Sequence, residues 1–184
     1  MEIKVVKNIM KANDQIASRN RENLNSSQVF CLNVMASPGA GKTTFILKLI
    51  EKLKGQVRVG VIEGDLSSSV DAKKVGATGT PVVQINTEGG CHLDANQLSD
   101  AFPSLPLEDL DLVIIENVGN LICTAGYDLG EHKRIVISSV PEGDDKPWKY
   151  PTMFNAVDGI VISKTSLLQY MDFKVPAFTE AVRA

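Results

Sequence analysis

The amino-acid sequence predicts a doubly wound α/β domain with a mostly parallel sheet and helices on both faces. Apolar runs rich in β-branched residues alternate with longer segments of helical periodicity, which is the pattern of consecutive βαβ units. Glycine and polar clusters fall directly after several of these runs, where the strands of such folds end and ligands bind. The length of 184 residues suits one ordinary domain with a sizeable core.

Six strands are predicted, at residues 29–35, 57–62, 81–86, 110–115, 134–140 and 159–163. The helix after the first strand has the clearest pattern, because Gly55 is a suitable C-terminal stop for it. Its apolar stripe consists of Ile46, Leu49, Ile50 and Leu53. Residues 141–151 are rich in turn formers and charges, so we predict a mobile surface loop there.

The N-terminal segment has the pattern of an amphipathic helix over residues 5–25. Polar Asn13 interrupts its apolar stripe for one turn, and the simplest expectation is that the helix packs on the domain or on a partner. We therefore divide the chain into an N-terminal helix, residues 1–26, and an α/β domain, residues 27–184. The apolar positions of the helix are Val6, Ile9, Met10, Ile16 and Ala17.

Composition favours a soluble, cytoplasmic protein. The hydrophobic fraction of 43% and charged fraction of 22% are ordinary, and a net charge of -3 argues against nucleic acid and anionic membranes as partners. The apolar run 112–115 is far too short to cross a bilayer, and the N-terminus lacks the apolar core of a signal peptide. Three cysteines without an export signal indicate a metal or core role rather than disulfides.

A glycine-rich loop between the first strand and the next helix predicts a phosphate site. Backbone NH groups at a helix N-terminus lack partners, and Gly39, Ala40 and Gly41 would let them close around phosphate oxygens. Lys42 would neutralise the β- and γ-phosphates, and the Thr43 hydroxyl would bind Mg²⁺. The strict motif begins with glycine, whereas this chain has alanine there. The whole segment reads Ala36-Ser37-Pro38-Gly39-Ala40-Gly41-Lys42-Thr43-Thr44.

Such a loop needs a carboxylate at the end of a neighbouring strand to hold Mg²⁺ or its water shell. Glu116 ends the fourth predicted strand, and Gly119, three residues on, could sense the γ-phosphate through its NH. Asp65 follows the second strand and could hold Mg²⁺ or orient the attacking water. The alternative is that either acid only caps a helix or faces solvent.

Cysteine and histidine residues follow two other predicted strands. Cys91 and His92 are adjacent after the third, and Cys123 comes a few residues after Glu116. Two thiolates and an imidazole suit Zn²⁺ or Ni²⁺, with an open position for water or for a second subunit across a dimer interface. By spacing alone these residues could equally belong to the core. Cys31 lies inside a strand pattern and is predicted to be core. The other histidine, His132, at a strand entrance, is predicted to be structural or solvent-facing.

Five motifs in order resemble the hydrogenase nickel-incorporation GTPases of the HypB family, and the match covers nearly the whole chain. The family resemblance implies a SIMIBI-type phosphate-loop G domain. The motifs are Ser37-Pro38-Gly39-Ala40-Gly41-Lys42-Thr43-Thr44, Val61-Ile62-Glu63-Gly64-Asp65, Gly90-Cys91-His92-Leu93-Asp94-Ala95, Ile114-Ile115-Glu116-Asn117-Val118-Gly119-Asn120-Leu121 and Asp128-Leu129-Gly130-Glu131-His132.

The resemblance also implies a function. The expected protein hydrolyses GTP slowly, helps deliver nickel to the large subunit of [NiFe]-hydrogenase, acts with the nickel chaperone HypA and forms a nucleotide-dependent homodimer. The family's bridging metal site matches Cys91, His92 and Cys123. Because Cys123 shares a loop with Glu116 and Gly119, loss of the γ-phosphate would move a metal ligand.

The sequence departs from the family pattern at two places, and other functions therefore stay open. The guanine-reading motif aligns with Ser163-Lys164-Thr165-Ser166, so Lys164 can still stack on a base. Ser166 offers no carboxylate to guanine, which weakens base discrimination by roughly 1–3 kcal/mol and leaves ATP open. The sequence stops at Ala184, before the family's last strand, which we interpret as truncation. Rival readings are a scaffold that binds metal and nucleotide without hydrolysis, or a metallochaperone GTPase for urease or a cobalamin enzyme.

Overall fold

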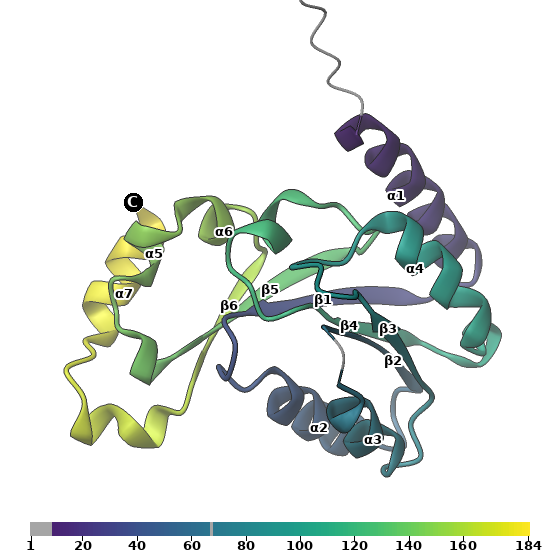
Figure 1. Ribbon diagram of the computed structural model, residues 1–184. Coiled ribbons are helices and arrows are strands. Elements are labelled where there is room, and N and C mark those ends of the chain that lie inside the picture. The colour runs from purple at the N-terminus through teal and green to yellow at the C-terminus, as the bar shows by residue number, and fades with distance from the viewer. Residues whose placement is uncertain (1–8, 67) are drawn as a thin grey trace, which may run out of the picture.

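The computed structural model describes residues 9–66 and 68–184. Six parallel strands form one sheet in the order β3-β2-β4-β1-β5-β6. The change of direction in this order lies beside β1, where ligands of doubly wound folds bind. Figure 1 shows helices on both sides of the sheet. The predicted fold class is therefore confirmed.

The strands begin and end within a few residues of the predicted ranges, and β6 matches its prediction. The largest difference is at β2, which continues through Asp65 because its last residues pair with β3, up to Asn86. Glu63 and Asp65 therefore both lie inside the strand, at alternate positions on one face. The bounds are β1 Phe30–Ala36, β2 Val59–Asp65, β3 Val82–Asn86, β4 Leu112–Glu116, β5 Lys133–Ser139 and β6 Gly159–Ser163.

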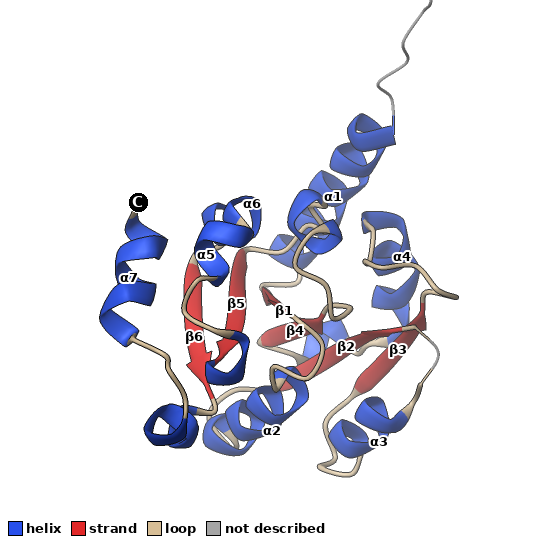
Figure 2. Ribbon diagram, turned by 60° about the vertical axis from the view of Figure 1, so that its left-hand side comes forward, coloured by secondary structure: helices blue, strands red, loops and turns tan. Residues whose placement is uncertain are grey.

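The helices divide between the two faces, as Figure 2 shows. Helices α2 and α3 cover one face, where Ile46 and Val75 pack on β-branched residues of the sheet. Helices α1 and α4 cover the other face near β2–β4, and α5, α6 and α7 cover it near β5 and β6. Their bounds are α1 Ile9–Ser26, α2 Lys42–Leu53, α3 Val70–Gly76, α4 Ala95–Ala101, α5 Lys146–Lys149, α6 Pro151–Asn155 and α7 Val175–Arg183.

The N-terminal helix differs from its prediction in which residues it buries. Residues 5–8 lie outside the described part, and Met10, predicted to be apolar contact surface, is exposed. Asn13 does not interrupt the buried stripe but belongs to it, because its amide makes hydrogen bonds to Ala95, at the start of α4, and to Asp128. The buried stripe is Asn13, Ala17, Asn20 and Leu24, at helical spacing.

The prediction of a mobile surface loop at residues 141–151 was wrong. The segment contains the end of a short 3₁₀ turn, Val140–Glu142, followed by α5 and the first residue of α6. Ser139 and Glu142 form a reciprocal capping box, and Pro147 is buried. Prolines at first-turn positions begin these short helices, since a missing N–H costs nothing there. Turn formers in this segment therefore start helices rather than a loop.

Within residues 9–66 and 68–184, every helix is too short or too polar to span a bilayer.

Candidate functional site

The loop between β1 and α2 adopts the backbone shape that the glycines predict. Gly39 and Gly41 have φ angles of 73° and 104°, in the left-handed region that glycine adopts without strain. Gly41 stands at the N-cap of α2, and Lys42, Thr43 and exposed Thr44 form the first turn. Buried Ala40 anchors the loop in the core below it. The first-turn NH groups of a helix have no acceptor within the helix itself, so this end of α2 is suited to bind an anion.

Two glutamates meet beside this helix end. The Thr43 hydroxyl donates to Glu116 Oε1 at 2.9 Å. Glu63 and Glu116 stand opposite one another on paired strands β2 and β4, and Asp71 of α3 brings a third carboxylate oxygen within 4.8 Å of theirs. The three carboxyl groups and Lys42 line a cavity of about 230 Å³. Sequence reasoning missed Glu63 and Asp71; the pairing of Glu63 with Glu116 follows from strand register.

The surroundings of Glu63 and Glu116 disfavour the charged form of both carboxyl groups. Burial, then the charge of Glu116, raises the pKa of Glu63 to about 10. Burial also raises the pKa of Glu116, and this rise is opposed first by a hydrogen bond with Glu63 and then by Lys42 and Thr43. Neither Glu63 Oε2 nor Glu116 Oε2 accepts a hydrogen bond from the part of the chain that the structure describes. Two buried carboxyl groups, a hydroxyl and orphaned oxygens fit a hard cation such as Mg²⁺.

The other predicted residues of this site lie around the same cavity. Asp65 lines it, and its Oδ1 accepts a hydrogen bond from Ser68 N at 2.6 Å. Gly119 lies against the glycine-rich loop, since a Cβ there would come within 3.0 Å of Pro38 Cα. Such a close approach requires glycine and places the backbone of Gly119 beside the cavity.

The segment predicted to read the base begins where β6 ends. Ser163 Oγ donates to the carbonyl of Ala40 at 2.7 Å and so ties this segment to the glycine-rich loop. Lys164 is exposed, with a left-handed φ of 56°. Ser166, two residues later, is also exposed.

The predicted thiol and imidazole residues come together. One ligand atom each from Cys91, His92 and Cys123 lie within 4.8 Å of one another, and Cys91 Sγ is 3.5 Å from His92 Nδ1. All three side chains are partly exposed. A hydrogen bond with Cys91 raises the pKa of the Cys123 thiol. We call these three residues the thiol cluster; its soft donors fit Zn²⁺ or Ni²⁺.

Neighbouring groups orient the thiol cluster. The ring of Tyr127 stacks on that of His92, with centroids 3.8 Å apart. The amide oxygen of Asn120 accepts from the backbone NH of Ile122 and of Cys123, which turns the chain at this ligand. Sequence reasoning missed Tyr127, because only the fold brings it to His92.

Asn117 connects two clusters, the Glu63–Glu116 pair with Thr43 and Asp71, and the thiol cluster. It follows Glu116 directly and is buried at 1% exposure. Its Oδ1 accepts from Leu93 N at 3.3 Å, one residue after His92, and its Nδ2 donates to Asn33 Oδ1. One short segment therefore carries Glu116 on the glycine-loop side and, through Asn117, contacts the thiol-cluster side.

Cys31 and His132 have the structural places predicted for them. Cys31 is fully buried, and burial raises the pKa of its thiol well above the usual range. Its backbone NH donates to His132 Nδ1 at 2.9 Å, and its carbonyl accepts from His132 N. The imidazole therefore extends the contact between β1 and the entrance of β5.

The parallel sheet and the glycine-rich loop between β1 and α2 together place the chain among proteins with the phosphate-loop NTPase fold. The family model described as "CobW/HypB/UreG, nucleotide-binding domain" matches residues 30–184. The hydrogenase maturation factor HypB of Escherichia coli (strain K12) is 46% identical over 167 residues, which are 91% of this chain and 58% of that protein. The probable HypB of Methanocaldococcus jannaschii is 45% identical, over 89% of this chain and 74% of that protein.

A solved structure of a HypB protein is also similar to this chain. The crystal structure of HypB from Helicobacter pylori in complex with nickel superposes with a TM-score of 0.90 at 40% identity, covering 94% of this chain and 81% of that one. The chain therefore belongs to the HypB family, within the CobW/HypB/UreG nucleotide-binding domains. It spans 58% of the length of the Escherichia coli relative.

Proposed function

We propose that this chain is a GTP-hydrolysing domain that assists nickel insertion into the large subunit of [NiFe]-hydrogenase in the cytoplasm. The observation that carries the proposal is the Thr43–Glu116 contact at the N-terminus of α2, beside a cavity lined by Glu63 and Glu116. Each of these two glutamates has a buried oxygen without a hydrogen-bond partner in the part of the chain that the structure describes. The nickel-bound relative and the family's role in hydrogenase maturation support the choice of metal and pathway.

The nucleotide half of the mechanism follows from the residues around the cavity. The first-turn NH groups of α2 and the Lys42 ammonium hold the β- and γ-phosphates, and the Gly119 NH contacts the γ-phosphate. Thr43 and Glu116 would hold Mg²⁺, with Glu63 and Asp71 behind them; when bound, the ion neutralises charge that develops on the phosphates. Asp65 orients the water that attacks in line.

The metal half uses the thiol cluster. Cys91, His92 and Cys123 hold Ni²⁺ or Zn²⁺ as cargo, with the fourth position open to water or to a second copy of the chain. Loss of the γ-phosphate releases the segment at Gly119, and the shift reaches the cluster through Asn117 and through Cys123 itself. Nucleotide state thereby controls nickel transfer and dimerisation, with HypA and the hydrogenase large subunit as partners.

Phosphate release under multiple turnover with GTP tests the enzyme. The expected result is turnover in the wild type that Lys42→Ala abolishes. Equal rates in the two proteins contradict hydrolysis and favour the non-hydrolysing scaffold. A parallel titration with ATP measures base choice, because exposed Ser166 offers guanine no carboxylate.

The metal site has its own test. Cys91→Ala and Cys123→Ala should each abolish stoichiometric binding of Ni²⁺ or Zn²⁺, while GTP affinity stays unchanged. Full affinity in both variants contradicts the ligand assignment. Hydrogenase maturation in a strain that lacks the protein separates this pathway from urease or cobalamin-enzyme maturation, since unaltered nickel incorporation contradicts our choice.

A further inference from the structure

Helix α1 buries two amides in the middle of its contact surface. Of the four buried positions, Asn13 is 7% exposed and Asn20 is 3% exposed, whereas Ala17 and Leu24 are apolar. An amide in such a place destabilises the fold unless its polar atoms find partners. Both amides find them outside α1, in two segments far away in sequence.

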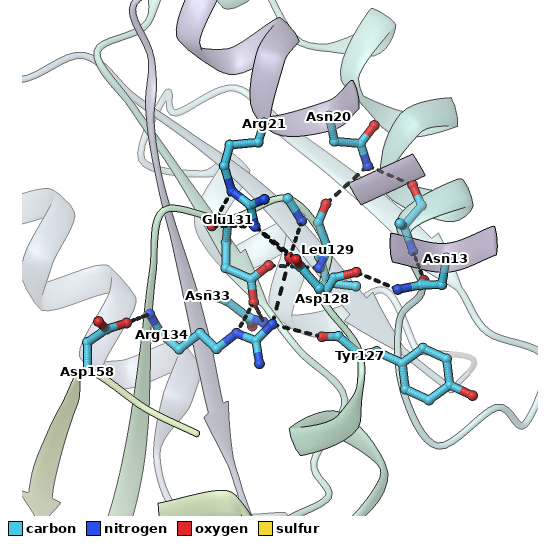
Figure 3. Close-up of polar contacts among 12 residues, drawn as sticks. Asn13, Asn20, Arg21, Asn33, Tyr127, Asp128, Leu129, Glu131, Arg134 and Asp158 are labelled. Carbon is cyan, nitrogen blue, oxygen red and sulfur yellow. Dashed lines mark hydrogen bonds and ion pairs between the residues drawn. The ribbon is translucent and has the colours of Figure 1, made fainter. Parts of the chain in front are cut away.

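Each asparagine joins the same two segments, as Figure 3 shows. Asn13 Nδ2 donates to the carbonyl of Asp128 at 2.8 Å, and its Oδ1 accepts from Ala95 N at 3.0 Å. Asn20 Nδ2 donates to the carbonyls of Ala95 at 2.8 Å and Leu129 at 3.0 Å. Each of the two asparagine side chains thus bridges the start of α4 to residues 128–129.

These two segments are the ones that carry the thiol cluster. Ala95 comes three residues after His92, and Asp128 comes five residues after Cys123. Fully buried Leu93 and the capping box of Asp94 at the start of α4 transmit the position of Ala95 to His92. On the other segment, Tyr127 precedes Asp128 and stacks on the His92 ring. The separation of the two segments therefore sets how closely the ligands approach.

The second segment also lies directly on the backbone of α1. A Cβ on Gly130, whose φ is +94°, would come within 2.6 Å of the carbonyl oxygen of Ala17 and of Asn20 Cβ. Arg21 adds an ion pair with Asp128 at 2.7 Å and hydrogen bonds to the carbonyl of Glu131. Such close packing fixes the position of residues 128–131 relative to α1.

We propose that Asn13 and Asn20 are positioning residues, which hold the His92 and Cys123 segments at the separation required to bind a thiophilic divalent cation. The inference rests on the proposed metal function of the thiol cluster. Apolar residues at these positions would bury α1 equally well, but only directional hydrogen bonds from one amide to two backbones fix their separation.

The first experiment needs no metal. The two thiols of the cluster can be oxidised to a Cys91–Cys123 disulfide by diamide, which takes up both thiol hydrogens, and the rate reports how often the segments are close. We expect slower disulfide formation in Asn13→Ala and Asn20→Ala than in the wild type. Cys123→Ala, which cannot form the bond, sets the baseline.

The second experiment measures Ni²⁺ affinity from the thiolate-to-nickel charge-transfer absorption. Loss of groups that orient metal ligands lowers affinity by about 10–100-fold, and we expect a loss in this range for Asn20→Ala. Gly130→Ala keeps both amides but pushes the loop from α1, so it should weaken nickel binding in the same direction. GTP affinity should stay at the wild-type value throughout.

Two variants of the same helix serve as controls. Asn23→Ala removes an exposed asparagine and should match the wild type in both assays. Leu24→Ala removes a fully buried apolar side chain from the core cluster that also contains Leu93 and Leu129, so it destabilises the fold while leaving the hydrogen bonds of Asn13 and Asn20 in place. All variants are compared at a temperature where thermal melts show each to be folded.

The outcomes separate this inference from the function on which it rests. Wild-type disulfide rates and nickel affinity in Asn20→Ala would overturn the positioning role, and so would equal losses in Leu24→Ala. A wild-type nickel band that survives in both Cys91→Ala and Cys123→Ala contradicts the proposed metal site instead, and the disulfide assay still decides the positioning role.

Discussion

The two clusters are built in different ways from the same sheet. Glu63 and Glu116 face each other because β2 and β4 pair in register, and Thr43, in the helix that follows β1 and the glycine-rich loop, donates to Glu116. The thiol cluster lies on two connecting segments, the second of which includes the 3₁₀ turn Cys123–Gly126, and side-chain hydrogen bonds from α1 and Asn117 hold these segments in place. Strand pairing positions the first cluster, whereas a few amides position the second. Substitutions should therefore affect the two clusters unequally.

The largest expected effect comes from the residue at which the two regions touch. Leu93 is fully buried and packs so closely on Gly64 that a Cβ there would come within 2.7 Å of it. Leu93→Ala should lower the free energy of unfolding by about 2–5 kcal/mol, the usual loss for a leucine core truncation. Urea denaturation followed by circular dichroism measures it. A loss below 1 kcal/mol would show that the site collapses around the smaller side chain.

Glu116→Gln should break the sheet-borne cluster alone. The amide cannot supply the negative charge for a divalent cation, so GTP turnover should fall by about 10²-fold, the usual size of losing one charge-stabilising group. Nickel stoichiometry at the thiol cluster should remain unchanged. Phosphate release and nickel titration on one sample check both statements, and simultaneous loss of nickel would contradict the separation of the two clusters.

Asn117→Ala should loosen the connection between the clusters. It leaves the buried NH of Leu93 without its acceptor, which costs about 1–3 kcal/mol. We also expect nickel affinity to respond less to a non-hydrolysable GTP analogue than it does in the wild type. Nickel titrations with and without the analogue give that ratio, and an undiminished ratio would assign the coupling to Cys123 alone.

The smallest expected effect is a pH dependence at His132. Burial and, after it, the charge of Arg21 lower the folded-state pKa of this imidazole below its usual value of 6.5, while Glu131 opposes them. The neutral form is therefore favoured by folding, and stability should be retained above pH 6.5 and fall as the pH drops below it. Nδ1 must stay unprotonated to accept from Cys31 N.

Thermal melts between pH 5 and 8 measure this loss. His132→Gln is the matched variant, since glutamine does not titrate, and its melting temperature should change less across this range. Identical slopes in the two proteins would assign the pH dependence to other groups.

Much of the sheet-borne cluster could be predicted from sequence. Gly39, Gly41 and Lys42 sit in a local motif, and strand ends of a parallel sheet share one edge, so Glu116 could be placed without coordinates. Glu63 could not, because strand β2 was expected to end at Ile62. Its pairing with Glu116 depends on a register that one chain's sequence does not specify.

The loop-borne cluster depends more on tertiary structure. The residues Cys91, His92 and Cys123 were identified, but spacing alone left them equally compatible with a core. Asn13 was misjudged as an interruption, since helical periodicity counts an amide as polar and cannot see partners 82 and 115 residues away. The loop predicted at 141–151 was wrong for a related reason: the prolines there, counted as turn formers, occupy the first turns of short helices.

The distant partners of Asn13 and Asn20 have a consequence for synthesis of the chain. The ribosome makes α1 before any residue that its amides bridge, and the last of these, Leu129, follows Asn20 by 109 residues. Until that part of the chain emerges, the buried stripe of α1 has only water to satisfy its amides. Docking of α1 through these amides is therefore completed late in vectorial folding, after Leu129 has left the ribosome.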